Sequence, residues 1–176
     1  VVNLCFHGIG EPRRPLEPGE ASYWMTENQF SQVLDAVRSL PFVRLSVDDG
    51  NTSDVEVVLP ALVARDLTAT FFVLAGRLDS PGSLGGQDVR ALHGAGMRVG
   101  SHGFAHTPWP ELSEELLDQE LVLARQTLAT LIDAPVDHAA CPLGRHDDNT
   151  LERLRDLGYA RVFTSARRAV DPDAWA

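Results

Sequence analysis

Apolar runs of strand length alternate along the chain with segments whose apolar residues recur at the spacing of a helix. The run Val43–Val47 shows the strand pattern clearly, because Arg44 and Ser46 separate its apolar residues and leave one face apolar. The run 69–74 is apolar on both faces, as in a parallel sheet covered on both sides. Six strands are predicted, over residues 1–6, 43–47, 69–74, 97–101, 136–140 and 159–164.

Helices are predicted between these strands. Thr26 and Gln29 form a capping box at the start of the first helix, Pro41 ends it, and Pro60 should kink the second. The predicted helices begin after Thr26, cover residues 54–65 and 87–93, and begin after the caps Ser113 and Asn149. Strand and helix alternate through the whole chain, which is typical of parallel βα units. Because no linker interrupts this pattern, we expect one catalytic domain over residues 1–176.

Polar residues of unusual character follow the predicted strands. His7 follows the first strand, Asp48 and Asp49 end the second, His102 follows the fourth and Pro142–Gly144 follows the fifth. In a barrel of parallel strands these ends meet on one face, where such folds place their active sites. A doubly wound open sheet would also bring strand ends to one edge, but the Gly-rich phosphate fingerprint is absent after the first strand.

Two histidines, His102 and His106, are four residues apart. On a helical turn this spacing places both imidazoles on the same side. Two histidines with one carboxylate make the open three-ligand set of a catalytic zinc site. One of the two aspartates Asp48 and Asp49 would then bind the metal, and the other would be free to take a proton from the activated water.

Composition and net charge limit the classes of molecule that the protein is expected to bind. Its 176 residues are enough for one domain with a core, and 44% apolar and 23% charged residues are ordinary for a globular chain. The net charge is −10, and all 15 basic residues are arginine. We therefore expect no nucleic acid partner and a neutral or cationic substrate, either a small molecule or an oligosaccharide.

Cysteine usage and hydrophobic run lengths bear on the compartment. Cys5 and Cys141 lack the CxxC spacing and lie in strand-like runs, so we expect two buried free thiols, with one disulfide as the alternative. No apolar run is long enough to cross a membrane. The chain starts at Val1, already inside a strand-like run, so its first residues say little about the cellular compartment. We expect the cytoplasm slightly more than the cell envelope or secretion.

The residues at these strand ends resemble a known family. The motifs Ser46-Val-Asp-Asp-Gly50 and Ser101-His-Gly-Phe-Ala-His106 are similar to the first two motifs of the polysaccharide deacetylases, also called the NodB-homology family or carbohydrate esterase family 4. The segment Ala140–Arg145 is similar to the third motif, and Ala69–Val73 also fits the layout of the family. The resemblance covers nearly the whole chain, from about residue 1 to residue 164.

The resemblance implies a fold, an activity and a cofactor. The fold is a distorted or incomplete (β/α) barrel of parallel strands. The activity is metal-dependent removal of acetyl groups from N-acetylated or O-acetylated carbohydrate. For an N-acetyl group this reaction hydrolyses a carbon–nitrogen bond that is not a peptide bond. The cofactor is one divalent ion, with zinc preferred and cobalt, nickel or manganese as alternatives.

The resemblance also implies roles for individual residues. Asp48 is the general base, and the backbone N–H of Leu143 stabilises the tetrahedral oxyanion. The metal ligands are Asp49, His102 and His106. In addition, we expect His7 and Trp109 to contact the substrate, because one lies at a strand end and the other can stack on a sugar ring.

One part of the family pattern is missing. The Leu-x-His motif that supplies a general acid has no counterpart, since no histidine follows His146. Either the C-terminal strand and its acid lie outside this sequence, or the acid comes from elsewhere, with His146 and His7 as candidates. Without an acid we expect activated acetate esters to be cleaved better than N-acetyl sugars.

Three other functions compete with the deacetylase interpretation. A metal-dependent amidohydrolase of cyclic amides or ureides could use the same ligands, and a catalytically impaired sugar-binding relative would explain the missing acid. A glycoside hydrolase is disfavoured, because it needs two carboxylates roughly 5–9.5 Å apart across the scissile bond. Adjacent Asp48 and Asp49 do not supply that arrangement.

Overall fold

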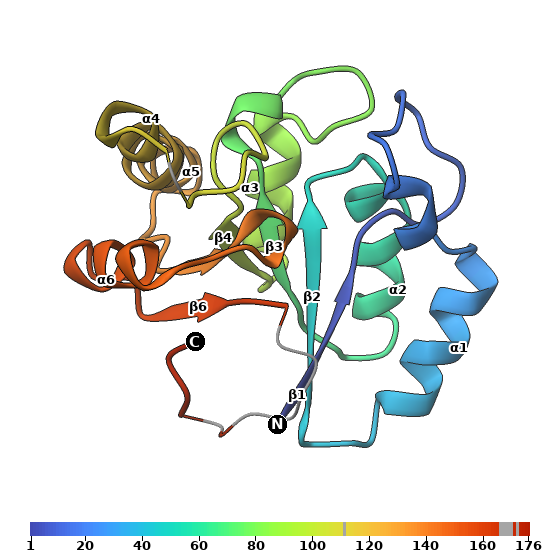
Figure 1. Ribbon diagram of the computed structural model, residues 1–176. Helices are drawn as coiled ribbons and strands as arrows, with labels where there is room; N and C mark the ends of the chain where they lie inside the picture. Colours follow the sequence, from blue (N-terminus) through green and yellow to red (C-terminus); the bar gives the residue numbers. More distant parts are fainter. Residues whose placement is uncertain (111, 166–170, 172) are drawn as a thin grey trace.

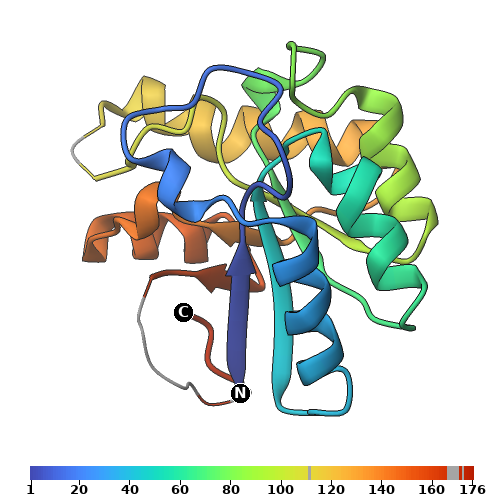
Figure 2. The same cartoon turned by 90° about the vertical axis from the view of Figure 1, so that its right-hand side faces the viewer.

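Six parallel strands pair in chain order, β1 to β6, and curl into half of a barrel (Figure 1). The computed structural model describes residues 1–110, 112–165, 171 and 173–176. The helices cover the outer face of the curled sheet, and α1 and α2 lie against β1 and β2 (Figure 2). The strands are β1 (Val2–Phe6), β2 (Val43–Asp49), β3 (Thr70–Val73), β4 (Arg98–Ser101), β5 (His138–Ala140) and β6 (Arg161–Phe163). This architecture confirms the expected incomplete (β/α) barrel.

The helical layer follows the predicted order. The helices are α1 (Glu27–Val37), α2 (Leu59–Val63), α3 (Gly86–Gly94), α4 (Glu114–Asp118), α5 (Ala124–Ile132) and α6 (Asp148–Asp156). The capping box of Thr26 and Gln29 is formed, and Ser113 caps α4. No described helix combines the length and the apolar character that a membrane crossing requires.

The structure bears out the predicted break near Pro60 and alters two other details of the predicted helices. A π-helical turn, Asp54–Val58, precedes α2, because Pro60 has no N–H to continue an ordinary helix across that point. Helix α6 is capped by Asp147, whose side chain accepts from the N–H of Thr150, and not by Asn149. The first helix ends at Val37 with Arg38 as its C-cap, and the N–H of Leu40 donates to the carbonyl oxygen of Val37 in the turn that follows, before Pro41.

Alternation along β1 and β2 separates core residues from site residues. On the outer face, Phe6 meets Phe30 of α1 edge to face, with ring centroids 5.0 Å apart, and Val47 is buried beside them. Residues at the alternate positions, including Cys5 and Ser46, face the concave side of the sheet. Cys5 is therefore exposed, which corrects the expectation of two buried thiols, whereas Cys141 is buried.

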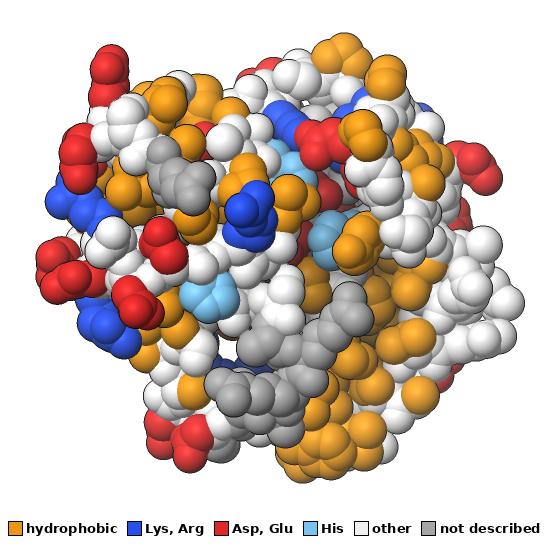
Figure 3. Space-filling view, in the orientation of Figure 1, with side chains coloured by type: hydrophobic (Ala, Val, Ile, Leu, Met, Phe, Trp, Pro, Cys, Tyr) orange, Lys and Arg blue, Asp and Glu red, His pale blue; other side chains and the backbone are white. Residues whose placement is uncertain are grey.

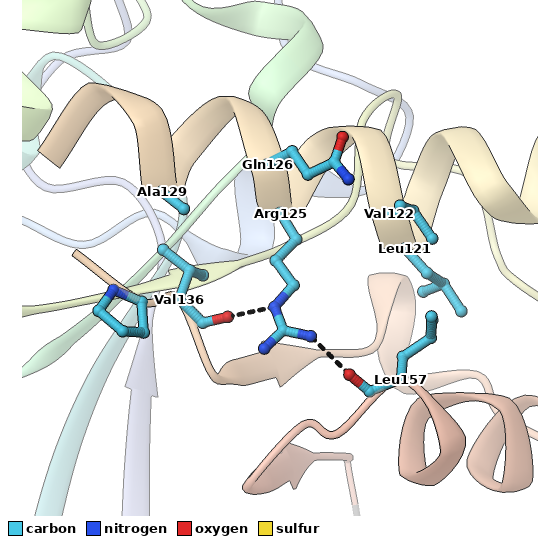
Figure 4. A pocket seen from close by; sticks show the side chains of 8 residues that line it. Leu121, Val122, Arg125, Gln126, Ala129, Val136 and Leu157 are labelled. Carbon is cyan, nitrogen blue, oxygen red and sulfur yellow. Dashed lines mark hydrogen bonds between the residues drawn. The ribbon is translucent and has the colours of Figure 1, made fainter. Parts of the chain in front are cut away.

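A smaller core lies between the π-helical turn Gln119–Leu123, α6 and the last two strands. Trp109, Leu121 and Leu154 are buried there, each with at most 1% of its surface exposed. Arg125 of α5 donates to the carbonyl oxygens of Val136 and Leu157 (Figure 4), which ties α5 to the segments leading into β5 and β6. These contacts hold β5 in place, and the candidate oxyanion turn follows this strand directly.

Candidate active site

Asp49, His102 and His106 come together at the carboxyl ends of β2 and β4. The Nε2 atoms of both histidines lie 3.5 Å from Oδ1 of Asp49. Asp49 and His102 are buried, and His106 is partly buried. In the space-filling view, histidine and acidic side chains gather in a hollow near the centre of the face (Figure 3). The structure thus brings together the three residues expected to bind metal.

Hydrogen bonds on the far side of each imidazole set its orientation. Nδ1 of His102 lies 2.9 Å from the carbonyl oxygen of Ala140, which can only accept, so the proton of a neutral ring is on Nδ1 and the lone pair is on Nε2. Nδ1 of His106 lies 2.9 Å from Oε2 of Glu17, which has the same effect. Each ring therefore directs an unprotonated nitrogen toward Asp49.

The resulting donor set fits a cation. Burial lowers the pKa of His102 to about 4, so its ring is neutral near pH 7. Oδ1 of Asp49 is buried and has no hydrogen-bond partner within the described part of the chain. Two nitrogen lone pairs and a carboxylate oxygen with no proton between them repel one another unless a positive ion lies among them.

The backbone is strained at three candidate site residues. Among described residues other than glycine, φ is positive at only six, and these include Asp49 (81°), His106 (60°) and Leu143 (54°). Such conformations cost about 1–3 kcal/mol each and concentrate at functional sites. The segment between the two histidines is a bend and not the helical turn expected, so the left-handed His106, rather than helical spacing, brings its ring back to Asp49.

Glu120, from the π-helical turn Gln119–Leu123, holds the histidine loop. Its carboxylate accepts from the backbone N–H groups of Phe104 and Ala105 and from Nε1 of Trp109. Gly103 leaves the room this carboxylate needs, since a Cβ there would collide with it. Trp109 is only 1% exposed and packs in the core, which corrects the expectation that it contacts substrate.

Asp48 lies on the concave side of the sheet, next to Cys5 and His7. Its Oδ1 is buried and lacks a hydrogen-bond partner among the described residues. Burial, reinforced by the charge of Asp49, raises the pKa of Asp48 to about 7. One ligand atom from each of Cys5, His7 and Asp48 lies within 4.8 Å of the others, so His7 is next to the expected base. The ring of His7 also packs against Tyr23, 4.9 Å between centroids.

Leu143 lies in the short turn Pro142–Gly144 that follows β5, and its own backbone angles are not helical. Its side chain is 62% exposed. The carbonyl of Ala140, three residues earlier, holds His102, so this turn adjoins the metal-ligand set. His146 is exposed and, in the described part of the chain, belongs to neither cluster of potential ligands.

The loop between β1 and α1 contributes groups that sequence analysis missed. Glu17 forms an ion pair with Arg77 as well as its contact with His106. Arg14 and Glu20 form a second pair, 2.5 Å apart, with side chains only 10% and 8% exposed. These contacts anchor the loop over the strand ends, and no local sequence pattern marks them.

Removal of the Glu17 carboxylate should weaken metal binding. Loss of such an outer partner of a ligating histidine typically costs about 10–100-fold in metal affinity, so we expect this loss for Glu17→Ala. Glu17→Gln should lose less, because its amide oxygen can still accept from Nδ1 of His106. Metal-competition titrations would measure both, with Glu11→Ala, an exposed position in the same loop, as the control. Unchanged affinity in Glu17→Ala would contradict a positioning role.

Comparisons with known proteins agree with this geometry. The family model described as polysaccharide deacetylase matches residues 37–162. YxkH of Bacillus subtilis (strain 168), a protein named after the same family, is 22% identical over 158 residues, which are 90% of this chain and 54% of the relative. The chain therefore spans about half the length of the curated relative it matches.

Solved structures share the fold. The deacetylase PplD of Streptococcus pyogenes, solved with acetate, has a TM-score of 0.80 and 21% identity, and the match covers 94% of this chain and 83% of PplD. IcaB of Ammonifex degensii has a TM-score of 0.76 and 22% identity, with 99% of this chain and 93% of IcaB covered.

Proposed function

Because the chain belongs to the polysaccharide deacetylase family, we propose that it is a metal-dependent hydrolase that removes acetyl groups from N-acetylated or O-acetylated carbohydrate. The observation that carries this proposal is the pair of histidine Nε2 atoms, each 3.5 Å from Oδ1 of Asp49. A cation-binding set at the carboxyl ends of parallel strands is suited to hydrolysis, since substrate can approach it from the open end of the half-barrel.

Asp49, His102 and His106 would hold the metal ion, and zinc fits best. Nitrogen and oxygen donors from three side chains are the usual ligands of catalytic zinc, and cobalt, nickel or manganese could use the same donors. When bound, a divalent cation lowers the pKa of water and polarises the carbonyl oxygen of the acetyl group.

Asp48 is suited to be the general base. Its pKa of about 7 means that the carboxylate is available near neutral pH and still binds a proton well. Asp48 would take the proton of the attacking water as the carbon–oxygen bond forms.

His7 is proposed as the general acid; burial lowers the pKa of its imidazole, so the ring would have to gain its proton during the reaction. The departing nitrogen of an amide must be protonated before the carbon–nitrogen bond breaks, and His7 has a ligand atom within 4.8 Å of Asp48. The lack of a histidine after His146 therefore no longer favours an impaired, sugar-binding protein. With His7 as the acid, the advantage expected for activated acetate esters over N-acetyl sugars would shrink.

The backbone N–H of Leu143 is proposed to donate to the oxyanion. Proline cannot adopt the φ of 54° at this position, so Leu143→Pro would disrupt the turn for an unrelated reason. An amide-to-ester replacement at residue 143 removes only the donor and should lower kcat by about 10²–10³-fold. Leu143→Gly keeps the N–H and accepts positive φ, so it should retain turnover. Equal kcat in the two variants would exclude the donor role.

Acetate release from an N-acetylglucosamine oligomer tests the proposed function. We expect release that stops with a chelator and returns with added zinc. His7→Ala should lose more activity on the oligomer than on an aryl acetate, because an aryl alcohol leaves without a proton. Zinc-loaded protein that releases acetate from neither substrate would refute the hydrolase proposal.

A further inference from the structure

A second group of potential metal ligands lies on the concave face of the sheet. Cys5, His7 and Asp48 each offer one ligand atom, and these atoms lie within 4.8 Å of one another. None of the three belongs to the first group of potential ligands, which is Asp49, His102 and His106. The group combines a thiol, an imidazole and a carboxylate, which are the three side-chain types that bind zinc.

Strand register produces this group. Cys5 pairs with Ser46 across β1 and β2. Asp48 lies two residues beyond Ser46 on β2, and side chains two residues apart on a strand share a face, whereas His7 directly follows the end of β1 at Phe6. Neighbouring strands are about 4.8 Å apart, so donors at matching positions come within reach of one ion. The pairing of β1 with β2, together with the residue that directly follows β1, therefore brings the three donors together.

The surroundings leave the donors available to an ion. Oδ1 of Asp48 is buried without a hydrogen-bond partner among the residues that the structure describes. Cys5 is an exposed residue on the concave face, and its thiol lies close enough to Asp48 to interact with that carboxyl group. The ring of His7 packs against Tyr23, which restricts its orientation. A cation would neutralise a buried carboxylate that lies beside the charge of Asp49.

We propose that Cys5, His7 and Asp48 form a second, inhibitory binding site for a thiophilic divalent cation such as zinc. Thiolate and imidazole favour zinc over magnesium or manganese. Asp48 and Asp49 are adjacent in the chain. An ion bound by Cys5, His7 and Asp48 would therefore repel an ion bound by Asp49, His102 and His106, so the second ion should bind more weakly than the first. Inhibition rests on the proposed function: the ion occupies the carboxylate that accepts the proton and the imidazole that donates one.

Metal content measures this site without reference to activity. Wild type, Cys5→Ser and Cys141→Ser would be dialysed against excess zinc without oxygen, and their zinc would be determined by elemental analysis. Wild type and Cys141→Ser, which loses a buried thiol outside both ligand groups, should each hold one ion more per chain than Cys5→Ser. Cobalt(II) should give a thiolate-to-cobalt charge-transfer band during the weaker binding phase, and Cys5→Ser should lack it.

Two results would overturn the second site. One is equal zinc content in wild type and Cys5→Ser, and the other is a wild-type cobalt titration without the thiolate band. If Cys5→Ser fails to fold, as judged by circular dichroism, Cys5→Ala and His7→Ala provide the same comparison. The comparison concerns a difference of one ion between proteins, so it stands even if the first site binds nothing.

The inhibitory consequence is measured separately. In acetate-release assays, half-inhibition of Cys5→Ser should require at least about tenfold more zinc than that of the wild type, since even an outer-shell partner is worth this much in metal affinity. Manganese in excess should not inhibit. Identical zinc inhibition of the two proteins would overturn the inhibitory role. Failure of the proposed function would appear differently, as no acetate release from any protein at any zinc concentration.

Discussion

Replacing Asp48 with asparagine should leave the first metal ion in place and lower kcat/KM by about a hundredfold to ten-thousandfold. Asparagine keeps the size of the side chain but cannot accept the proton of water. Asp48 is not among the three groups that converge on the candidate metal position, so metal content at limiting zinc should stay at the wild-type value. Steady-state kinetics and elemental analysis of the same preparations would measure both effects.

The pH profile gives a second signature of this base. Burial and the charge of Asp49 raise the pKa of Asp48 to about 7, and a cation beside it would favour the carboxylate and lower that pKa. Since the carboxylate is the active form, kcat/KM should rise with pH along an acidic limb whose midpoint lies at or below about 7. Asp156→Asn, an exposed change at the end of α6, is the control. A fully active Asp48→Asn protein would show that another group is the base.

Removal of a metal ligand should have an effect at least as large. Asp49→Ala and His106→Ala each leave two of three donors, so we expect loss of stoichiometric zinc and of chelator-sensitive turnover. Zinc content after dialysis, measured together with acetate release, tests both consequences.

His93→Ala is a matched control for these variants, because His93 is an exposed histidine on α3 outside both ligand groups. It should keep the zinc content and turnover of the wild type. Full zinc occupancy and wild-type turnover in both Asp49→Ala and His106→Ala would refute the assigned ligand set.

Local periodicity explains why the fold was predictable. The alternation of Val43–Val47 and the capping box at Thr26 are set by residues close in sequence, and they indicate strands and helices directly. The alternation of strands and helices then implies a parallel sheet with its carboxyl ends on one face, where the structure has Asp49 and His102. Their sequence motifs predicted this part of the site.

Long-range contacts explain what the sequence did not reveal. Glu17 meets His106 across 89 positions, and no pattern within the β1–α1 loop signals that contact. Glu120 looks like an ordinary polar helix residue until the fold brings Trp109 and the histidine loop onto it. The closeness of His7 to Asp48 depends on the register of β1 against β2, which sequence periodicity alone does not set.

Anomalous diffraction from crystals of the zinc-loaded protein, recorded on both sides of the zinc absorption edge, tests the central claim most directly. The account predicts one strong zinc peak at limiting zinc, about 2.0–2.2 Å from a carboxylate oxygen of Asp49 and from Nε2 of His102 and His106. A catalytically active crystal form with no peak among these three residues, or with its zinc bound elsewhere, would contradict it.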